Sequence, residues 1–261
     1  LRLLCSVILS NVFTAILDED CSLELSFLVD SSESAKDNHE QEKRFVMNMV
    51  DRLQGVRLQT GRSLSLRVAL LQYSSHVITE QTFSEWRGSE NFKTRIAPII
   101  CIGHGTYTTY AITNMTKIYL EESSPGSIKV VVLLTDGISH PRNPDIFSAV
   151  ADAKNQGIKF FTLGITRTAN EPANTAQLRL LASSPTSHYL HNLQDEDVVE
   201  KIATVILATG NKKVKCQRGK LIKSSPRFCF ILQGKKGRPG DDGAPGLKGQ
   251  KVRAFRWTSA L

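Results

Sequence analysis

Apolar runs and amphipathic helical segments alternate along most of this chain. The first run, Leu23 to Val29, is short, bounded by polar residues and typical of a central strand. Ile128 to Leu134 is more apolar and shows no alternation, which fits a strand covered on both faces. Over residues 38–53, by contrast, Phe45 and Met49 belong to a set of apolar side chains at helical spacing. The pattern therefore predicts strands that are each followed by a helix.

The same periodicities predict elements along the rest of the chain. The further strands are 66–73, 77–83, 159–165 and 189–193, and the further helices are 106–120, 144–153, a segment around 178–181, and 197–208. Asn143 is expected to cap the helix at 144–153, with Pro144 at its first position. Only short polar residues separate the runs 66–73 and 77–83, which indicates a hairpin at one edge of the sheet.

This alternation predicts an α/β fold in which a doubly wound, mostly parallel sheet carries helices on both faces. In sheets of this kind, ligands bind beyond the carboxyl ends of the strands. The acidic segments 30–34 and 135–137 both follow predicted strands. We therefore expect a binding site at that edge of the sheet.

Residues 1–17 have the features of a secretory signal peptide. Arg2 gives a positive flank, Leu3 to Leu17 is largely apolar, and acidic residues follow at once. The run is short for a bilayer span, so we expect a secreted protein without a membrane span. A buried N-terminal helix is the alternative, which the acidic patch disfavours. Secretion also makes Asn114, in the sequon Asn114-Met115-Thr116, a predicted glycosylation site.

Secretion permits disulfides, and Cys21, Cys101, Cys216 and Cys229 remain once the signal is removed. Cys21 lies just before the first predicted strand and Cys216 just after the last predicted helix. A bridge between these two would staple the ends of the domain, worth about 5 kcal/mol in the chain-entropy model. Spacing alone leaves the connectivity open, because other pairings use the same cysteines. Cys101 lies in an apolar run and is expected to be a buried thiol.

The net charge of +8 is distributed unevenly along the 261 residues. Residues 211–261 hold 14 of the 33 Lys and Arg residues but only 2 of the 25 acidic ones, so the part before them is mildly acidic. A basic tail is typical of solvation or polyanion contact and does not indicate a nucleic-acid-binding domain. We expect a globular domain over 22–210 and a basic, cysteine-containing linker over 211–233, with no nucleic-acid partner.

The tail also contains a strict three-residue repeat. Glycine recurs at every third position from Gly234 to Gly249, with Pro239 and Pro245 in the third place of their triplets. Only glycine fits the axis of three polyproline-like chains, so 234–251 carries a collagen signature that a flexible linker would not require. Residues 252–261 break the period and are expected to be a non-collagenous tail. A repeat this short, roughly 55 Å at the polyproline rise, is not expected to form a stable triple helix alone.

Oxygen-bearing side chains gather at the predicted strand ends. Asp30, Ser32 and Ser34 supply a carboxylate and two hydroxyls at alternate positions, Asp136 follows a later strand, and Thr106 lies in a glycine-rich loop. Hard oxygen donors of this kind suit Mg²⁺. Each piece alone has a simpler explanation, because an Asp-Ser-Ser turn commonly caps a helix and Asp-Gly commonly forms only a turn. Their order on successive strand ends is what favours a metal site.

In that order and spacing, the five residues resemble the metal-ion-dependent adhesion site (MIDAS) of von Willebrand factor A domains. The family pattern is Asp-x-Ser-x-Ser after the first strand, a threonine in a Gly-rich loop, and Thr-Asp-Gly after the fourth strand. The resemblance covers roughly residues 22–210. It implies that these residues bind Mg²⁺ (or Mn²⁺ or Ca²⁺) and that an acidic side chain of a partner completes the shell. Thr109 and Tyr110 stand where the family usually has glycine, which leaves the path of that loop open.

An A domain followed by collagen triplets is similar to the non-fibrillar, type VI-like collagens. That resemblance implies a secreted extracellular-matrix protein that adheres to other matrix proteins and assembles into trimers with collagen chains. The basic tail adds sulfated glycosaminoglycan as a candidate partner. The alternative is a structural domain that spaces or assembles collagen chains while its metal site stays unused.

The sequence does not favour an enzyme. Phosphatases that form an aspartyl-phosphate carry a second carboxylate two residues after the nucleophile, but position 32 is serine here. A Gly-x-Ser-x-Gly elbow and a phosphate-binding P-loop are also missing from the sequence. We therefore expect a binding protein.

Overall fold

The computed structural model describes residues 22–57, 64–137 and 139–221, and the side chains of this part up to residue 209. The expected signal peptide, the linker beyond residue 221, the collagen triplets and the final tail lie outside the described residues. Those expectations stay predictions.

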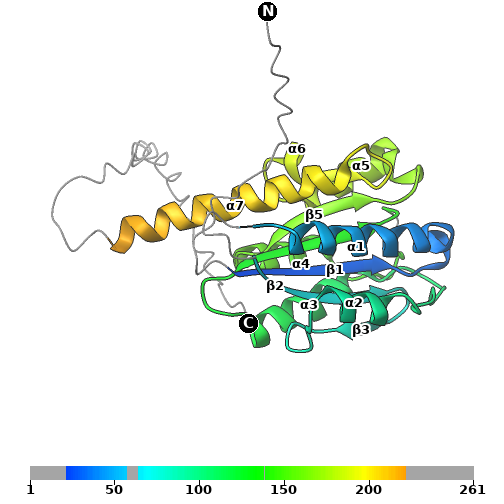
Figure 1. Ribbon diagram of the computed structural model, residues 1–261. Helices are drawn as coiled ribbons and strands as arrows, with labels where there is room; N and C mark the ends of the chain where they lie inside the picture. Colours follow the sequence, from blue (N-terminus) through cyan, green and yellow to red (C-terminus); the bar gives the residue numbers. More distant parts are fainter. Residues whose placement is uncertain (1–21, 58–63, 138, 222–261) are drawn as a thin grey trace, which may run out of the picture. The chain divides into compact units, whose positions relative to one another are not determined.

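One sheet runs through the described part, with the strand order β3-β2-β1-β4-β5-β6 (Figure 1). Its strands are β1 (Ser22–Asp30), β2 (Ser65–Tyr73), β3 (Val77–Gln81), β4 (Ile128–Thr135), β5 (Lys159–Gly164) and β6 (Leu190–Asn192). Neighbouring strands are parallel except β2 and β3, which form an antiparallel hairpin at one edge. The mostly parallel sheet and its edge hairpin are therefore confirmed.

Helices cover both faces of the sheet. They are α1 (His39–Gln54), α2 (Ser89–Ile96), α3 (Thr108–Glu122), α4 (Ile146–Asn155), α5 (Pro172–Leu181), α6 (Thr186–Tyr189) and α7 (Val198–Leu221), with short 3-10 turns η1 (Glu33–Asn38) and η2 (Thr168–Asn170). One buried cluster lies between the sheet and α1, α2 and α7, which Figure 1 shows in front of the strands. A second cluster lies on the other face beneath α3, α4 and α5. The central strands are buried on both faces, which explains why β4 lacks alternation.

The start of α4 corrects one prediction. The helix begins at Ile146, and its N-cap is Asp145, whose carboxylate accepts the backbone N–H groups of Phe147 and Ser148. Asn143 does not cap it, because its side-chain oxygen instead accepts the backbone N–H of Thr109 (3.1 Å) at the start of α3. A contact from a distant segment thus takes the residue that local rules favoured.

Two further boundaries differ from the sequence prediction. Helix α7 continues to Leu221, well past residue 208, so the first part of the expected linker is helical. Tyr189 belongs to the short helix α6, and strand β6 begins only at Leu190. The short helix α2 was not predicted, since only two of its side chains, Phe92 and Ile96, are buried.

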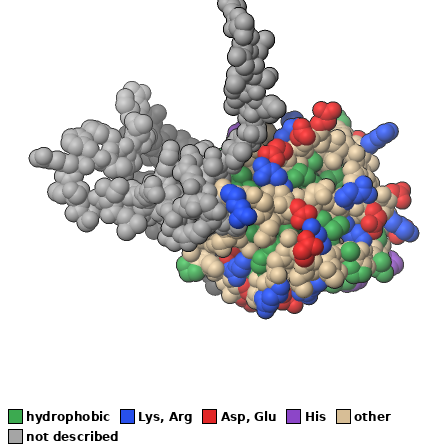
Figure 2. All heavy atoms as spheres, viewed as in Figure 1, with side chains coloured by type: hydrophobic (Ala, Val, Ile, Leu, Met, Phe, Trp, Pro, Cys, Tyr) green, Lys and Arg blue, Asp and Glu red, His purple; other side chains and the backbone are tan. Residues whose placement is uncertain are grey.

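The face shown in Figure 2 is not dominated by one charge. Figure 2 shows acidic and basic side chains interspersed over the face it presents. Among the described residues, no helix is both long and apolar enough to cross a membrane.

Candidate metal centre

Strand β1 carries the first predicted ligands to the carboxyl edge of the sheet. The strand is buried up to its last residue, Asp30, which is fully buried. Oδ1 of Asp30 accepts a hydrogen bond from the backbone N–H of Ser32 (3.1 Å), which turns the chain directly after the strand. The turn places the hydroxyl oxygens of Ser32 and Ser34 3.2 Å apart. Asp30, Ser32 and Ser34 therefore lie together.

Strand β4 brings Asp136 to the same place. This residue directly follows the strand and is almost completely buried. Its Oδ2 accepts a hydrogen bond from the Ser34 hydroxyl (2.5 Å). The two residues are far apart in the sequence, and the parallel pairing of β1 with β4 is what brings them together.

Thr106 reaches the cluster from the glycine-rich loop. The backbone N–H of Gly103 donates to the carbonyl of Ser31 (2.8 Å), which ties this loop to the turn after β1. Gly103 has a left-handed backbone (φ 81°), a conformation that glycine adopts without steric cost. Thr106 is buried, and it lines with Ser34 a cavity of about 510 Å³. The structure thus brings all five predicted residues to one edge of the sheet.

The residue that departs from the expected loop pattern, Thr109, has a defined role. Its backbone N–H donates to Asn143, and its hydroxyl donates to the carbonyl oxygen of Pro144 (2.8 Å). Helix α3 already begins at Thr108, so Thr109 ties the first turn of α3 to the segment before α4. The loop reaches the site with threonine at this position.

The two carboxylates of the cluster affect each other. Burial, and then the negative charge of Asp136, raise the pKa of Asp30 to about 7. The hydroxyl of Tyr73 lies 3.5 Å from Oδ2 of Asp30 and donates to the carbonyl oxygen of Leu134 (2.8 Å). The described residues place no Lys or Arg in an ion pair with Asp30.

A third buried carboxylate, Glu42, lies behind the site. It comes from α1, is fully buried, and its Oε2 accepts the backbone N–H of Asp30 (3.2 Å). Its other oxygen, Oε1, has no hydrogen-bond partner in the described part of the chain. Burial, and then the charge of Asp30, raise the pKa of Glu42 well above its usual range. Sequence analysis missed this residue, although its spacing from Phe45 and Met49 places it on the buried face of the helix.

The chemistry of this cluster fits a hard divalent cation. Carboxylate and hydroxyl oxygens are the donors that Mg²⁺ and Ca²⁺ prefer. A buried carboxylate such as Asp30, which forms no ion pair with a Lys or Arg of the described residues, is unfavourable unless it is protonated or binds a cation. Nowhere in residues 22–57, 64–137 and 139–221 do three or more His, Cys, Asp or Glu side chains group in a way that could hold a metal. A metal here would therefore depend on the hydroxyls as well as on the carboxylates.

The remaining predicted site residues are only partly described. Asn114 lies exposed on α3. Cys21 and the side chain of Cys216 lie outside the described residues, so their pairing stays a prediction. Cys101 is half-buried, with its Sγ 3.3 Å from the carbonyl oxygen of Ser31, so the expectation of a buried thiol is wrong. The reason is that its apolar run forms a surface loop, in which Ile100 is 80% exposed.

The fold and this site define a class of protein, and comparison of sequences agrees. The von Willebrand factor type A domain matches residues 24–205. The chain belongs to that family.

Relatives with this domain include matrilins and collagens. The chain is 29% identical to matrilin-3 of Gallus gallus over 189 residues, which are 70% of this chain and 39% of the relative. It is 28% identical to the collagen alpha-1(XX) chain of Mus musculus, covering 70% of this chain and 13% of that one. It is 27% identical to the human collagen alpha-1(VI) chain over 264 residues, covering 91% of this chain and 24% of the relative. The chain thus spans well under half the length of these relatives.

A solved structure shares the fold. Proximal thread matrix protein 1 from the mussel byssus, solved with a zinc-occupied MIDAS motif, has a TM-score of 0.56 and 21% identity. The similarity covers 72% of this chain and 48% of that one.

Proposed function

We propose that this chain is an extracellular-matrix protein of the collagen type whose A domain adheres to other matrix proteins through a divalent cation, Mg²⁺ or else Mn²⁺ or Ca²⁺. The observation that carries the proposal is the hydrogen-bonded cluster at the carboxyl edge of the sheet. There, the hydroxyl of Ser34 links the turn after β1 to the carboxylate of Asp136. Asp30 and Asp136 are buried beside it.

In this proposal Asp30, Ser32, Ser34, Thr106 and Asp136 hold the cation. The bound ion supplies positive charge that attracts an acidic side chain of the partner. Ser34 is exposed while Asp30 is fully buried, so the cluster has an open side and a closed side. The cavity lined by Ser34 and Thr106 gives a partner access to the open side.

The relatives support the matrix assignment. Matrilins and collagens are extracellular-matrix proteins, and they carry domains similar to this one. The zinc in the MIDAS of the mussel protein supports a metal at the corresponding place here. Among collagens, the order of one A domain followed by Gly-Lys-Lys-Gly-Arg-Pro triplets most resembles the alpha-1 chain of collagen XXVIII.

Further proposals concern the rest of the chain. We infer secretion directed by residues 1–17, a Cys21–Cys216 disulfide, trimer assembly through 234–251, and glycosaminoglycan contact through the basic tail. Asn114 is proposed to carry an N-glycan, which the exposure of its side chain on α3 permits. The proposed role is adhesion without enzymatic turnover.

The test is equilibrium binding of the full chain to immobilised matrilin and collagen VI, in Mg²⁺ and in EDTA. Binding in Mg²⁺ that is lost in EDTA and in Asp136→Ala supports the proposal. Asp37→Asn is the matched control, because this exposed acid in η1 lies outside the cluster. Calorimetric titration with Mg²⁺ separates the steps: no heat and no thermal shift would favour the structural spacer role. Binding that persists in EDTA at unchanged folding would contradict the metal-bridged mechanism.

A further inference from the structure

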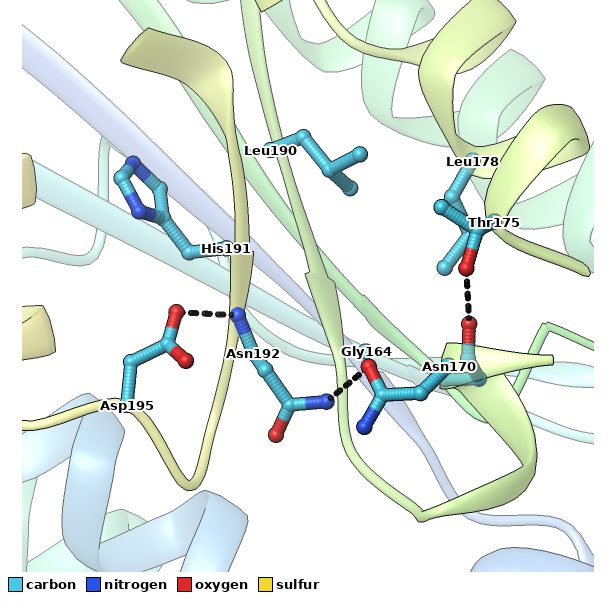
Figure 3. A pocket seen from close by; sticks show the side chains of 9 residues that line it. Gly164, Asn170, Thr175, Leu178, Leu190, His191, Asn192 and Asp195 are labelled. Atoms are coloured by element: carbon cyan, nitrogen blue, oxygen red, sulfur yellow. Dashed lines mark hydrogen bonds between the residues drawn. The ribbon is translucent and has the colours of Figure 1, made fainter. Parts of the chain in front are cut away.

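A second cavity opens at the carboxyl edge, between the edge strand β6 and helix α5 (Figure 3). Its volume is about 200 Å³. The floor is apolar and the rim is polar, and the lining residues are Gly164, Ala169, Asn170, Thr175, Leu178, Leu190, His191, Asn192 and Asp195. In Figure 3, Leu190 and Asn192 project from β6 toward α5 and η2, while His191 points to the opposite side of the strand.

A glycine allows close packing within the lining of the cavity. Gly164 is the last residue of β5, and a Cβ added there would lie 2.7 Å from the Cβ of Ala169. It would also lie 3.4 Å from Nδ2 of Asn192 and 3.7 Å from the side chain of Leu178. Any larger residue at position 164 would therefore clash with Ala169 and displace this part of the lining.

Internal hydrogen bonds hold the polar rim in place. The carboxylate Oδ2 of Asp195 accepts the backbone N–H of Asn192 (2.8 Å), and Nδ2 of Asn192 donates to Oδ1 of Asn170 (3.0 Å). The hydroxyl of Thr175 donates to the carbonyl oxygen of Ala169 (3.0 Å). These bonds leave acceptor capacity on the second carboxylate oxygen of Asp195, on Oδ1 of Asn170 and on the Thr175 oxygen. The rim is fixed and rich in acceptors.

The charge of the cavity has one sign. Asp195 is the carboxylate among the described lining residues, which include no Lys or Arg. Glu196 and Asp197 follow it in the sequence, and the described residues show no ion pair for any of these three acids. Burial lowers the pKa of His191 and outweighs the opposing effects of its hydrogen bond to the carbonyl oxygen of His188 (3.0 Å) and of the charge of Asp195, so this ring is mostly uncharged at neutral pH. Arg167 lines a separate hollow that shares Asn170 with this cavity.

The position of the cavity relates it to the metal centre. Thr135, Gly164 and Asn192 pair with one another across β4, β5 and β6, so they form one row at the carboxyl edge. Asp136 directly follows Thr135. Since neighbouring strands lie about 4.8 Å apart, the metal centre and the cavity are roughly 10 Å apart along this edge. One partner surface can contact both.

We propose that this cavity binds a basic side chain, arginine or lysine, of the same partner that places a carboxylate at the metal centre. The apolar floor fits the methylene stem of such a side chain, and the acceptors of the rim fit its N–H donors. The proposal rests on the proposed function for its partner, but the cavity's preference for a cation can be measured without metal. The A domain then selects partners that carry an acidic and a basic residue about 10 Å apart.

The test uses the ¹⁵N-labelled full chain in EDTA, with N-acetyl-arginine amide as the probe and N-acetyl-citrulline amide as its neutral match. Arginine amide should shift the amide resonances of Asn170, Asn192 and Asp195, with millimolar affinity, and citrulline amide should not. Asp195→Asn keeps an oxygen for the N–H of Asn192 but removes the charge, so it should weaken arginine binding about fivefold. Asp152→Asn, an exposed acid on α4, is the matched control and should bind as wild type.

Equal shifts with citrulline amide, no shifts at all, or unchanged affinity in Asp195→Asn would each overturn the proposal. Thermal melts confirm that the variants fold. Because EDTA removes any metal, such a failure leaves the proposed metal-dependent adhesion untouched. Conversely, arginine binding in EDTA would survive the loss of metal-dependent adhesion, so the two failures are distinguishable.

Discussion

Neutralising Asp30 should stabilise the metal-free domain, although this residue is a proposed metal ligand. Burial and the nearby charge of Asp136 raise its pKa from 3.8 to about 7. Between these values the folded chain binds more protons than the unfolded chain, so this carboxyl makes the folded state less stable as pH rises. Above pH 7, the difference between the two pKa values lowers the free energy of unfolding by about 4 kcal/mol. Roughly 2–3 kcal/mol of this loss develops between pH 5 and pH 8.

Denaturant unfolding in EDTA at pH 5 and pH 8 measures the effect. Asp30→Asn stays neutral and keeps an oxygen for the backbone N–H of Ser32, so its stability advantage over wild type should grow by roughly 2–3 kcal/mol between these pH values. The quantity to compare is the difference in stability between Asp30→Asn and wild type at each pH. Burial lowers the pKa values of His39 and His191, so these residues make both proteins more stable as pH rises, and their contribution cancels in the difference. Asp37→Asn, an exposed neighbour, should follow wild type.

Magnesium should reduce the stability advantage of Asp30→Asn over wild type. At about 100 times its Kd, an ion that binds only the folded state adds about 2.7 kcal/mol. Wild type should gain this stability and Asp30→Asn should not. If the difference between wild type and Asp30→Asn in EDTA does not widen from pH 5 to pH 8, the account of a buried, mutually repelling carboxylate pair is wrong.

Three further predictions test the scaffold around the site. Asp145→Ala removes the cap that accepts two backbone N–H groups of α4 and should lower the free energy of unfolding by about 1 kcal/mol. Denaturant unfolding should show a lower midpoint at unchanged slope, and an unchanged midpoint would contradict the capping role. Tyr119→Phe removes a buried hydroxyl that donates to the carbonyl oxygen of Val130 (2.6 Å). In the same assay it should lower the free energy of unfolding by about 1–2 kcal/mol. An unchanged free energy would mean that this carbonyl oxygen finds another donor. Burial raises the pKa of Glu24, but hydrogen bonds from the backbone N–H of Ser124, from Arg67 and from the hydroxyl of Ser127 outweigh burial and lower this pKa below 4.5. The stabilisation by Glu24 is therefore lost as pH falls through the lowered pKa. Glu24→Gln should flatten the loss of stability measured below pH 4.5, and an unchanged loss of stability in acid would refute the assignment.

The order of elements could be predicted because apolar period is a local property. The uninterrupted run 128–134 identified a strand buried on both faces, and the structure places it at the centre of the sheet. Parallel strands end at the same edge, so the acidic segments after β1 and β4 were expected to meet. The hydrogen bond between Ser34 and Asp136 is the direct result.

Local rules failed where a distant segment competed for the same group. Asn143 and Asp145 are both good N-cap residues by type. The sequence cannot distinguish them, because the choice depends on a distant residue. The backbone N–H of Thr109 donates to the side-chain oxygen of Asn143, which is then not available to cap α4. Cys101 shows the same limit, because whether its apolar run is buried depends on tertiary packing, and here the run forms a surface loop beside Ser31.

The sequence by itself determined the class of fold and the identity of the candidate ligands, because strand period and the order of Asp30, Thr106 and Asp136 are written along the chain. Only the tertiary structure decided the electrostatics and the second cavity. Glu42 is a typical surface residue by type, and it becomes a buried carboxylate behind Asp30 only when α1 packs on the sheet. The cavity beside Gly164 likewise forms only when β5, β6, η2 and α5, which are separate in the sequence, come together. Charge coupling and cavity shape depend on distances between residues that are far apart in sequence, and folding alone sets those distances.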